Sequence, residues 1–155
     1  MAKTSAGLIL YRIRQGRPEF LLVHPGGPFF QKKDNGAWSI PKGEVGPSED
    51  LLAAAQREFR EELGLEPQGP FLPLEPIRQK SGKRVHAWAF EGDCDPSRIH
   101  SNTFTLEWPP RSGRFVEFPE IDRAEFFDLE TALQKVMPAQ RPLLEQLAAR
   151  LGFAP

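Results

Sequence analysis

Proline and glycine interrupt this chain so often that long helices are excluded over most of its length. There are 16 prolines and 13 glycines among the 155 residues, which is about a fifth of the chain and above average usage. Because proline breaks helices and glycine favours turns, a helical bundle is excluded, and short elements joined by shaped loops are expected. The length predicts a single domain over residues 1–155.

One segment carries a long helical pattern. Apolar residues recur at helical spacing from Leu51 to Leu63. Ser48 is the expected N-cap of this helix and Gly64 the expected C-terminal cap. Strands are expected at residues 4–13, 20–24, 77–79, 85–91, 103–108, 115–118 and 125–129, and further helices at 129–136 and 140–151. Strands and helices that alternate without internal repeats predict an α/β or α+β domain.

Charge and cysteine content exclude several classes of protein. The formal net charge is −1 and the pI about 6.3, which argues against a protein that coats nucleic acid or an anionic membrane. The single cysteine, Cys94, lies between two aspartates that disfavour a thiolate, so a reactive thiol is not expected. The apolar stretch 6–11 is too short for a signal peptide or a membrane span. A cytoplasmic protein with no membrane partner is therefore expected.

Three glutamates lie side by side on the predicted helix. At about 100° per residue, Glu58, Glu61 and Glu62 fall within an arc of about 100° that adjoins the apolar stripe. Two interpretations fit this arc: a solvated acidic face beside the core, or a site for a hard cation. Oxygen ligands alone suit Mg²⁺ or Mn²⁺, and phosphate chemistry is the natural use of such an ion.

The spacing around this helix favours the cation site. From Gly43 the chain reads GEVGPSEDLLAAAQREFREELGL, which is Gly, five residues, Glu49, seven residues, and then REFREELGL ending at Leu65. These 23 residues resemble in full the motif of the Nudix hydrolases. The resemblance implies an α/β/α sandwich around a mixed β-sheet. It also implies a pyrophosphohydrolase, in which water attacks the diphosphate of a nucleoside diphosphate linked to another moiety.

The resemblance also implies a role for each polar position of the motif. The family's metal-binding carboxylates correspond to Glu58, Glu61 and Glu62, and the metal is Mg²⁺ or Mn²⁺. The carbonyl of Gly43 often adds a metal ligand in the family. Glu49 is expected to support the structure, and Arg57 to hold the glutamates in place for catalysis.

Many family members use a further acidic residue outside the motif, as a base or as an extra metal ligand. Glu120 is the favoured candidate, because it lies in FPEIDRAEFF and related enzymes often carry a loop glutamate several residues before an aromatic strand. Glu107 and Glu117 are the alternatives.

The residues before the motif indicate a substrate class. The sequence from Trp38 to Gly43 is similar to the lead-in of hydrolases of diadenosine tetraphosphate and other dinucleoside polyphosphates. Glu44 departs from the histidine that plant- and animal-type enzymes commonly carry there. A cation at Lys42 suits a polyphosphate chain, and an ion pair with a nearby glutamate is the alternative interpretation.

Further side chains are candidates for substrate contact. Lys80, Lys83 and Arg84 are expected either to hold distal phosphates or to form a solvated hairpin turn, and Arg111 and Arg114 are a third basic group. The aromatic residues available for stacking on a base are Phe29, Phe30, Trp88 and Trp108.

Two other functions remain as alternatives. One is a pyrophosphohydrolase of nucleoside triphosphates or of 5′-triphosphate RNA, and the other is a Nudix-fold module that senses a nucleotide without cleaving it. The intact motif glutamates favour an enzyme, and the basic patches are only local, so a nucleic-acid partner is not expected. The expected partner is a small nucleoside polyphosphate, bound by a monomer or a homodimer.

Overall fold

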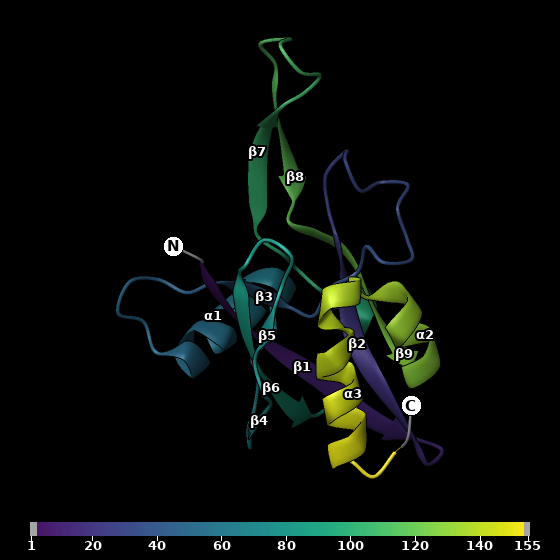
Figure 1. Ribbon diagram of the computed structural model, residues 1–155. Coiled ribbons are helices and arrows are strands. Elements are labelled where there is room, and N and C mark those ends of the chain that lie inside the picture. Colours follow the sequence, from purple (N-terminus) through teal and green to yellow (C-terminus); the bar gives the residue numbers. More distant parts are fainter. Residues whose placement is uncertain (1–2, 154–155) are drawn as a thin grey trace.

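A mixed β-sheet forms the centre of the computed structural model, which describes residues 3–153 (Figure 1). Its strands are β1 (Thr4–Arg14), β2 (Arg17–Pro25), β3 (Lys42–Glu44), β4 (Leu72–Pro73), β5 (Ile77–Arg78), β6 (Arg84–Glu91) and β9 (Ile121–Asp128). The hydrogen-bonded order is β4–β6–β1–β2–β9, with β3 also paired to β1 and β5 also paired to β6. β1 runs parallel to β6, whereas the other pairs are antiparallel.

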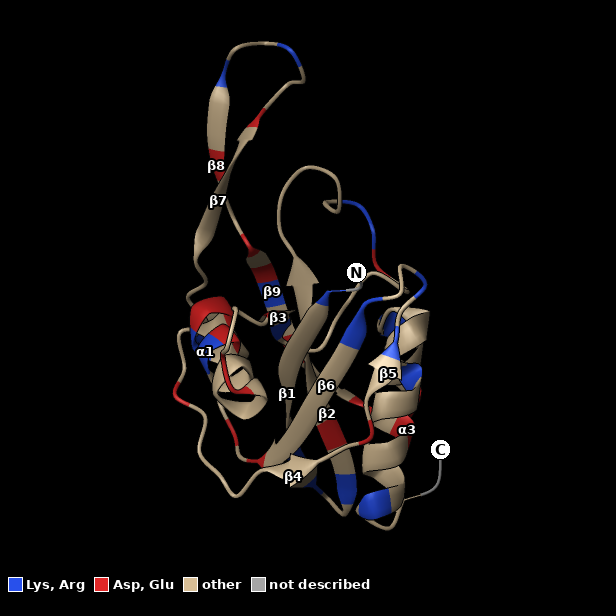
Figure 2. Cartoon of the chain, turned by 60° about the vertical axis from the view of Figure 1, so that its left-hand side comes forward, with Lys and Arg blue, Asp and Glu red and all other residues tan. Residues whose placement is uncertain are grey.

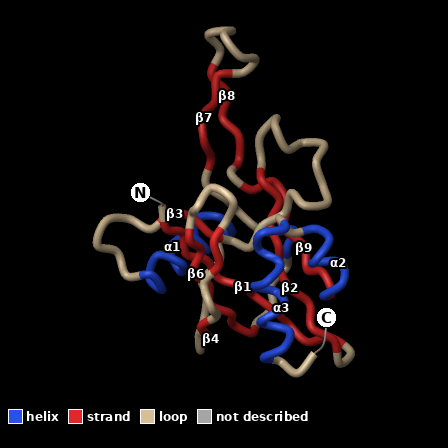
Figure 3. Tube along the Cα trace, viewed as in Figure 1, coloured by secondary structure: helices blue, strands red, loops and turns tan. Residues whose placement is uncertain are grey.

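Alternating side chains give this sheet two apolar faces. The helices are α1 (Leu51–Leu63), α2 (Leu129–Lys135) and α3 (Arg141–Arg150), with short 3₁₀ turns at Pro96–Arg98 and Pro138–Gln140. In β1, Leu8 and Leu10 pack in the core beneath α1, whereas Ile9 packs in the core beneath α2 and α3. Figure 3 shows helices on both faces of the sheet. The expected α/β/α sandwich is therefore confirmed.

The ends of α1 are set by two local conformations. The N-cap is Asp50, not the expected Ser48: Asp50 is extended, and its carboxylate accepts a hydrogen bond of 3.0 Å from Ala53 N. Ser48 has a φ of 61° and lies in the turn before the helix, so it lacks the extended backbone of an N-cap. Gly64 ends the helix with a φ of 69°, as expected. A Cβ at Gly64 would also lie 2.7 Å from the carbonyl oxygen of His100.

β7 (Thr103–Glu107) and β8 (Phe115–Pro119) form a separate antiparallel pair, which we call the arm. In Figure 1 the arm projects away from the central sheet. The chain then enters β9, which starts at Ile121 and is longer than expected. β9 pairs with β2 along its length, from Glu19 opposite Asp128 to Pro25 opposite Ile121, and this pairing extends it beyond its own sequence pattern.

The loop that follows β2 is held against the sheet by a buried histidine. His24 Nδ1 lies 2.7 Å from Asp122 Oδ1, and His24 Nε2 lies 2.7 Å from the carbonyl oxygen of Lys33. The Trp38 indole N–H donates to Asp34 at 2.8 Å, which fixes the end of the same loop. Among residues 3–153, no helix combines the length and the apolar character that crossing a bilayer requires.

Candidate active site

Two glycines permit close approaches at the motif strand β3: Gly7 between β1 and β3, and Gly43 between β3 and α1. β3 pairs with the start of β1, with Gly43 opposite Ala6 and Lys42 opposite Gly7. A Cβ at Gly7 would lie 2.4 Å from the carbonyl oxygen of Pro41. A Cβ at Gly43 would lie 2.0 Å from the Glu58 carboxylate. The motif glycine therefore lets the carboxylate of Glu58, on α1, lie directly against its Cα.

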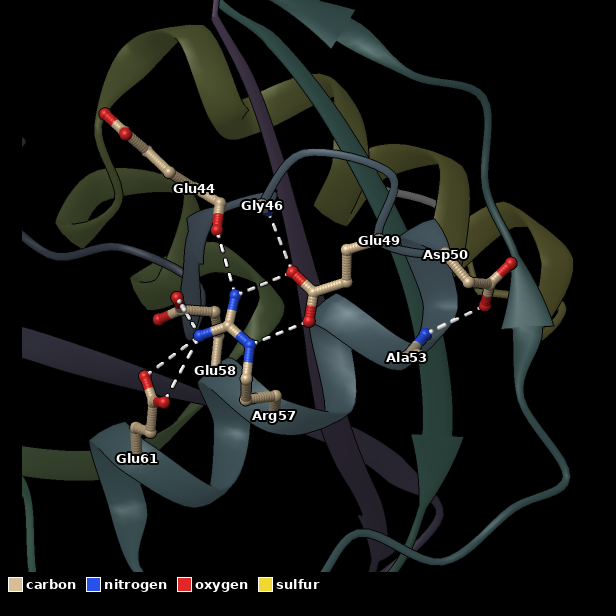
Figure 4. Close-up of polar contacts among 8 residues, drawn as sticks. All are labelled: Glu44, Gly46, Glu49, Asp50, Ala53, Arg57, Glu58 and Glu61. Carbon is tan, nitrogen blue, oxygen red and sulfur yellow. Dashed lines mark hydrogen bonds and ion pairs between the residues drawn. The ribbon is translucent and has the colours of Figure 1, made fainter.

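Arg57 joins three carboxylates of the motif (Figure 4). Its Nε and Nη2 donate to the two carboxylate oxygens of Glu49 at 2.8 and 3.0 Å. Its Nη1 donates to Glu58 at 2.8 Å and to both oxygens of Glu61 at 3.2 Å. The Arg57 guanidinium, together with the Gly46 N–H, lowers the pKa of Glu49 to about 2. Glu49 therefore anchors the arginine, and the arginine orients the next two glutamates.

Glu62 lies deeper than Glu58 and Glu61, the other two motif glutamates of α1. Its Oε1 accepts a hydrogen bond of 3.2 Å from the backbone N–H of Lys42. Burial, reinforced by the nearby Glu58 carboxylate, raises the pKa of Glu62 to about 8. Burial also raises the pKa of Glu58 and of Glu120, and Glu61 contributes to both shifts. The site therefore gathers carboxylates at positions where negative charge is poorly stabilised.

The structure separates the three downstream acids. Glu120, between β8 and β9, lies close enough to Glu61 and Glu62 to perturb or be perturbed by their charges. Glu107 instead accepts hydrogen bonds from backbone N–H groups in the turn of the arm, and Glu117 accepts one of 2.6 Å from Thr103 Oγ1. Glu107 and Glu117 thus stabilise the arm, and of the three acids Glu120 alone joins the helix glutamates.

A cavity of about 290 Å³ opens beside these carboxylates. Lys42, Glu62 and Glu120 contribute its polar wall, and Phe30 and Met137 contribute to its apolar wall. A second cavity, of about 310 Å³, lies behind α1 and is lined by neither the helix glutamates at 58, 61 and 62 nor Glu120. Of these two cavities among residues 3–153, the first therefore places a ligand next to the acidic cluster. The sequence did not predict that Met137 lines the cavity, because Met137 belongs to no motif and comes from the segment between α2 and α3.

The predicted basic residues divide into two groups. Lys42 is half-buried, and burial together with the nearby Lys83 ammonium lowers its pKa. The Lys83 ammonium lies 3.8 Å from the Glu44 carboxylate. Lys80 and Arg84 are exposed, and no ion pair among residues 3–153 links them to the acidic cluster. Lys83 therefore lies near Lys42 and Glu44, whereas Arg84, at the start of β6, is exposed.

As they stand, no three acidic, histidine or cysteine side chains among residues 3–153 are arranged to hold a metal ion. Arg57 Nη1 contacts Glu58 and Glu61 at once, and these contacts occupy oxygens that a cation would need. Glu49 keeps two further contacts to the same guanidinium. Arg57 could therefore release Glu58 and Glu61 to a cation and remain bound to Glu49.

An acidic helix on an α/β/α sandwich is the architecture of a Nudix-type hydrolase. Residues 1–147 match the family described as NUDIX domain, and the chain belongs to the Nudix family.

Individual relatives agree with this assignment. Bis(5′-nucleosyl)-tetraphosphatase [asymmetrical] of Caenorhabditis elegans is 40% identical over 65 residues, which are 42% of this chain and 43% of that protein. The match thus spans less than half the length of that relative. RNA pyrophosphohydrolase of Rhodospirillum rubrum is 28% identical over 160 residues, covering 91% of this chain and 88% of the relative. Both names support an enzyme of the pyrophosphohydrolase class.

A solved structure shares the fold. A binary complex of the C. elegans Ap4A hydrolase has a TM-score of 0.66 to this chain, at 24% identity, and the match covers 97% of this chain and 98% of that one. At this identity the likeness concerns the fold, which agrees with the mixed sheet and flanking helices described above.

Proposed function

We propose that this protein is a Mg²⁺- or Mn²⁺-dependent pyrophosphohydrolase that cleaves a dinucleoside polyphosphate such as diadenosine tetraphosphate. The observation that carries the proposal is the convergence of Glu58, Glu61, Glu62 and Glu120 beside a cavity whose wall also holds Lys42. Carboxylates that hold a cation and a lysine that pairs with phosphate both stabilise the charge that develops in phosphoanhydride hydrolysis.

The residues present fit a divalent cation. Glu58, Glu62 and Glu120 have raised pKa values because burial and mutual repulsion disfavour their charged forms, and a positive charge relieves both effects. All donors are oxygens, which Mg²⁺ and Mn²⁺ prefer, and the Gly43 carbonyl is a further candidate ligand. When bound, such an ion supplies neutralisation of phosphate charge and a more acidic water molecule.

The side chains of the site suit a hydrolytic displacement. The oxygen of water bonds to one phosphorus atom, the bridging P–O bond breaks, and the bridging oxygen leaves with the other phosphate. Glu120 is the candidate to take the proton of the attacking water, because it faces the same cavity as Glu62. Lys42 lies in that wall too, where its ammonium stabilises phosphate charge. Two phosphate-bearing products result.

The dinucleoside substrate rests on the lead-in sequence that ends at Lys42 and on the name of the C. elegans relative. The cavity has one charged wall and one apolar wall, which suits a nucleoside attached to a polyphosphate. A 5′-triphosphate RNA is the second candidate substrate, because the relative named RNA pyrophosphohydrolase matches 91% of the chain. A sensing module without hydrolysis is disfavoured by the complete set of motif glutamates.

The metal assignment is tested with E61Q and E62Q, each assayed with Mg²⁺ and with Mn²⁺. Each variant should lower kcat by roughly 10²-fold or more while circular dichroism stays unchanged. The matched control is E66Q, because Glu66 is exposed, follows the same helix and, among residues 3–153, pairs only with Arg60, at 2.7 and 2.8 Å. Wild-type activity in both E61Q and E62Q would contradict the assignment.

The substrate is tested with a panel of diadenosine tetraphosphate, nucleoside triphosphates, ADP-ribose and 5′-triphosphate RNA. We expect the highest kcat/KM for diadenosine tetraphosphate. If it is cleaved no faster than the other compounds, the dinucleoside assignment fails while the pyrophosphohydrolase assignment stands. The same reactions in ¹⁸O-labelled water identify which phosphorus atom is attacked, because only its product phosphate gains the label.

A further inference from the structure

The arm carries an apolar face that the sheet core does not use. β7 and β8 pair only with each other in the structure of residues 3–153. Their register sets Phe104 opposite Phe118 and Leu106 opposite Val116, so these four side chains share one face. Trp108 follows on the same face, because it lies two residues beyond Leu106.

The loop after β2 faces this side of the arm. The Phe29 ring packs edge-on against Trp108 with the ring centroids 5.4 Å apart, and a Cβ at Gly27 would lie 2.9 Å from the Phe104 ring. Phe29 is nevertheless 59% exposed, and the neighbouring Phe30 is exposed as well. Loop and arm together therefore present one accessible aromatic surface, which we call the aromatic strip: Phe29, Phe30, Phe104 and Trp108.

The aromatic strip starts at the active site. Asn102, just before β7, donates its N–H to the carbonyl oxygen of Glu61 and accepts from the N–H of Glu120, both at 2.8 Å. Gly26, in the loop, donates to the carbonyl oxygen of Glu120, also at 2.8 Å. Phe30 lines the same cavity as Glu120. The five residues of β7 then extend the surface roughly 17 Å away from the carboxylates.

Two arginines stand at the outer end of the arm. Arg114 precedes β8 by one residue, on the same face as Val116, and Arg111 lies in the turn. Neither has an ion-pair partner among residues 3–153, because Glu107 is engaged by N–H groups of the turn. Figure 2 shows these basic segments at the tip. The arm and its turn, residues 103–119, have no net charge. The arm is therefore suited to contact a few phosphates but not a long stretch of nucleic acid.

We propose that the aromatic strip binds the second nucleoside of a dinucleoside polyphosphate, the one farther from the acidic cluster. Its base stacks on the exposed ring of Phe29, which packs edge-on against Trp108, and Arg114 pairs with a phosphate that the carboxylate site does not hold. The 290 Å³ cavity takes the first nucleoside. This inference rests on the proposed function and adds the site that distinguishes a dinucleoside from a mononucleoside substrate.

The test compares two substrates with equal numbers of phosphates, diadenosine tetraphosphate and adenosine 5′-tetraphosphate, which lacks the second nucleoside. The F29A variant should raise KM for diadenosine tetraphosphate roughly 10-fold and change KM for adenosine 5′-tetraphosphate by less than about twofold. The matched control is F115A. Phe115 is 69% exposed and lies opposite Glu107, on the other face of the arm, so this variant should leave both KM values unchanged.

The inference is overturned if F29A raises both KM values equally, or if F115A has the same effect as F29A. It is also overturned if F29A impairs 5′-triphosphate RNA more than diadenosine tetraphosphate, since the strip would then serve RNA. Wild-type protein that cleaves neither tetraphosphate contradicts the proposed function itself. Wild-type protein that cleaves both with equal KM contradicts the aromatic strip alone, so the two failures are distinguishable.

Discussion

At the scale of single residues, Arg57 contacts two of the three motif glutamates of α1, Glu58 and Glu61. Its guanidinium donates to Glu49 through Nε and Nη2. The third nitrogen, Nη1, donates to both Glu58 and Glu61. A lysine at this position has a single ammonium and cannot reproduce two parallel contacts to Glu49 while reaching the other carboxylates. The sequence motif predicted this positioning role, and the distances supply its physical basis.

R57K should therefore lower kcat/KM by roughly 10- to 100-fold, the range found when a group that orients a metal ligand is replaced. Steady-state kinetics over a Mg²⁺ titration measures the effect, which should include a higher Mg²⁺ requirement. R60K is the control, because Arg60 pairs with the exposed Glu66 outside the site. Equal kinetics for R57K and wild type would show that Arg57 does not orient the glutamates.

Glu49 gives a prediction on pH. Its hydrogen bonds from Arg57 lower its pKa from 4.5 to about 2, so its ionised form stabilises the folded state. That stabilisation is fully present above the unfolded pKa and is lost as the pH falls from about 4.5 toward 2. Urea unfolding of wild type and E49Q should differ most at neutral pH, and the difference should shrink across this interval. A difference that stays constant down to pH 2 contradicts the pairing.

At the scale of elements, the sequence predicted most strands and helices because their signals are local. The continuous apolar run of β1, the proline breaks and the Gly64 cap all act over a few residues, and α2 begins after Asp128 as expected. The predicted N-cap of α1 was wrong because Ser48 and Asp50 both belong to residue types that are favoured as N-caps. The backbone dihedral angles, which the sequence does not display, decide between them.

This correction is testable by stability. D50A should reduce the free energy of unfolding by about 1 kcal/mol, because the N–H of Ala53 loses its acceptor. S48A should change it by less than about 0.5 kcal/mol, because Ser48 precedes the cap in a turn. Chemical denaturation of the two variants provides the comparison. A larger loss in S48A than in D50A would restore Ser48 as the N-cap.

At the scale of the whole molecule, the sheet separates two hydrophobic cores, of which one supports the motif helix α1 and the other packs against α2 and α3. Phe59 and Leu63 of α1 pack in the core on the active-site face, whereas Leu143, Leu144 and Leu147 of α3 pack in the core on the opposite face. The sequence predicted the sandwich through its family resemblance. It did not predict the site contacts of Asn102, because these are made by backbone atoms that any residue possesses.

L144A therefore separates stability from catalysis. Leu144 is completely buried in the core on the face of the sheet opposite α1, so its truncation should cost about 2–5 kcal/mol of unfolding free energy. Activity measured well below the unfolding transition should stay within about twofold of wild type. Thermal unfolding and initial rates on the same sample measure both quantities. A large loss of kcat in folded L144A would show that the two cores are coupled.

The independence of the arm has an evolutionary consequence. β7 and β8 hydrogen-bond to each other and not to the central sheet, so residues can be inserted into or removed from the turn between them without breaking a strand pair of the core. At Gly43, in contrast, an added Cβ would displace the Glu58 carboxylate from its place beside β3. We expect proteins descended from this chain to differ in what the arm recognises, while the motif on β3 and α1 stays the same. New substrates would then arise through changes in one hairpin.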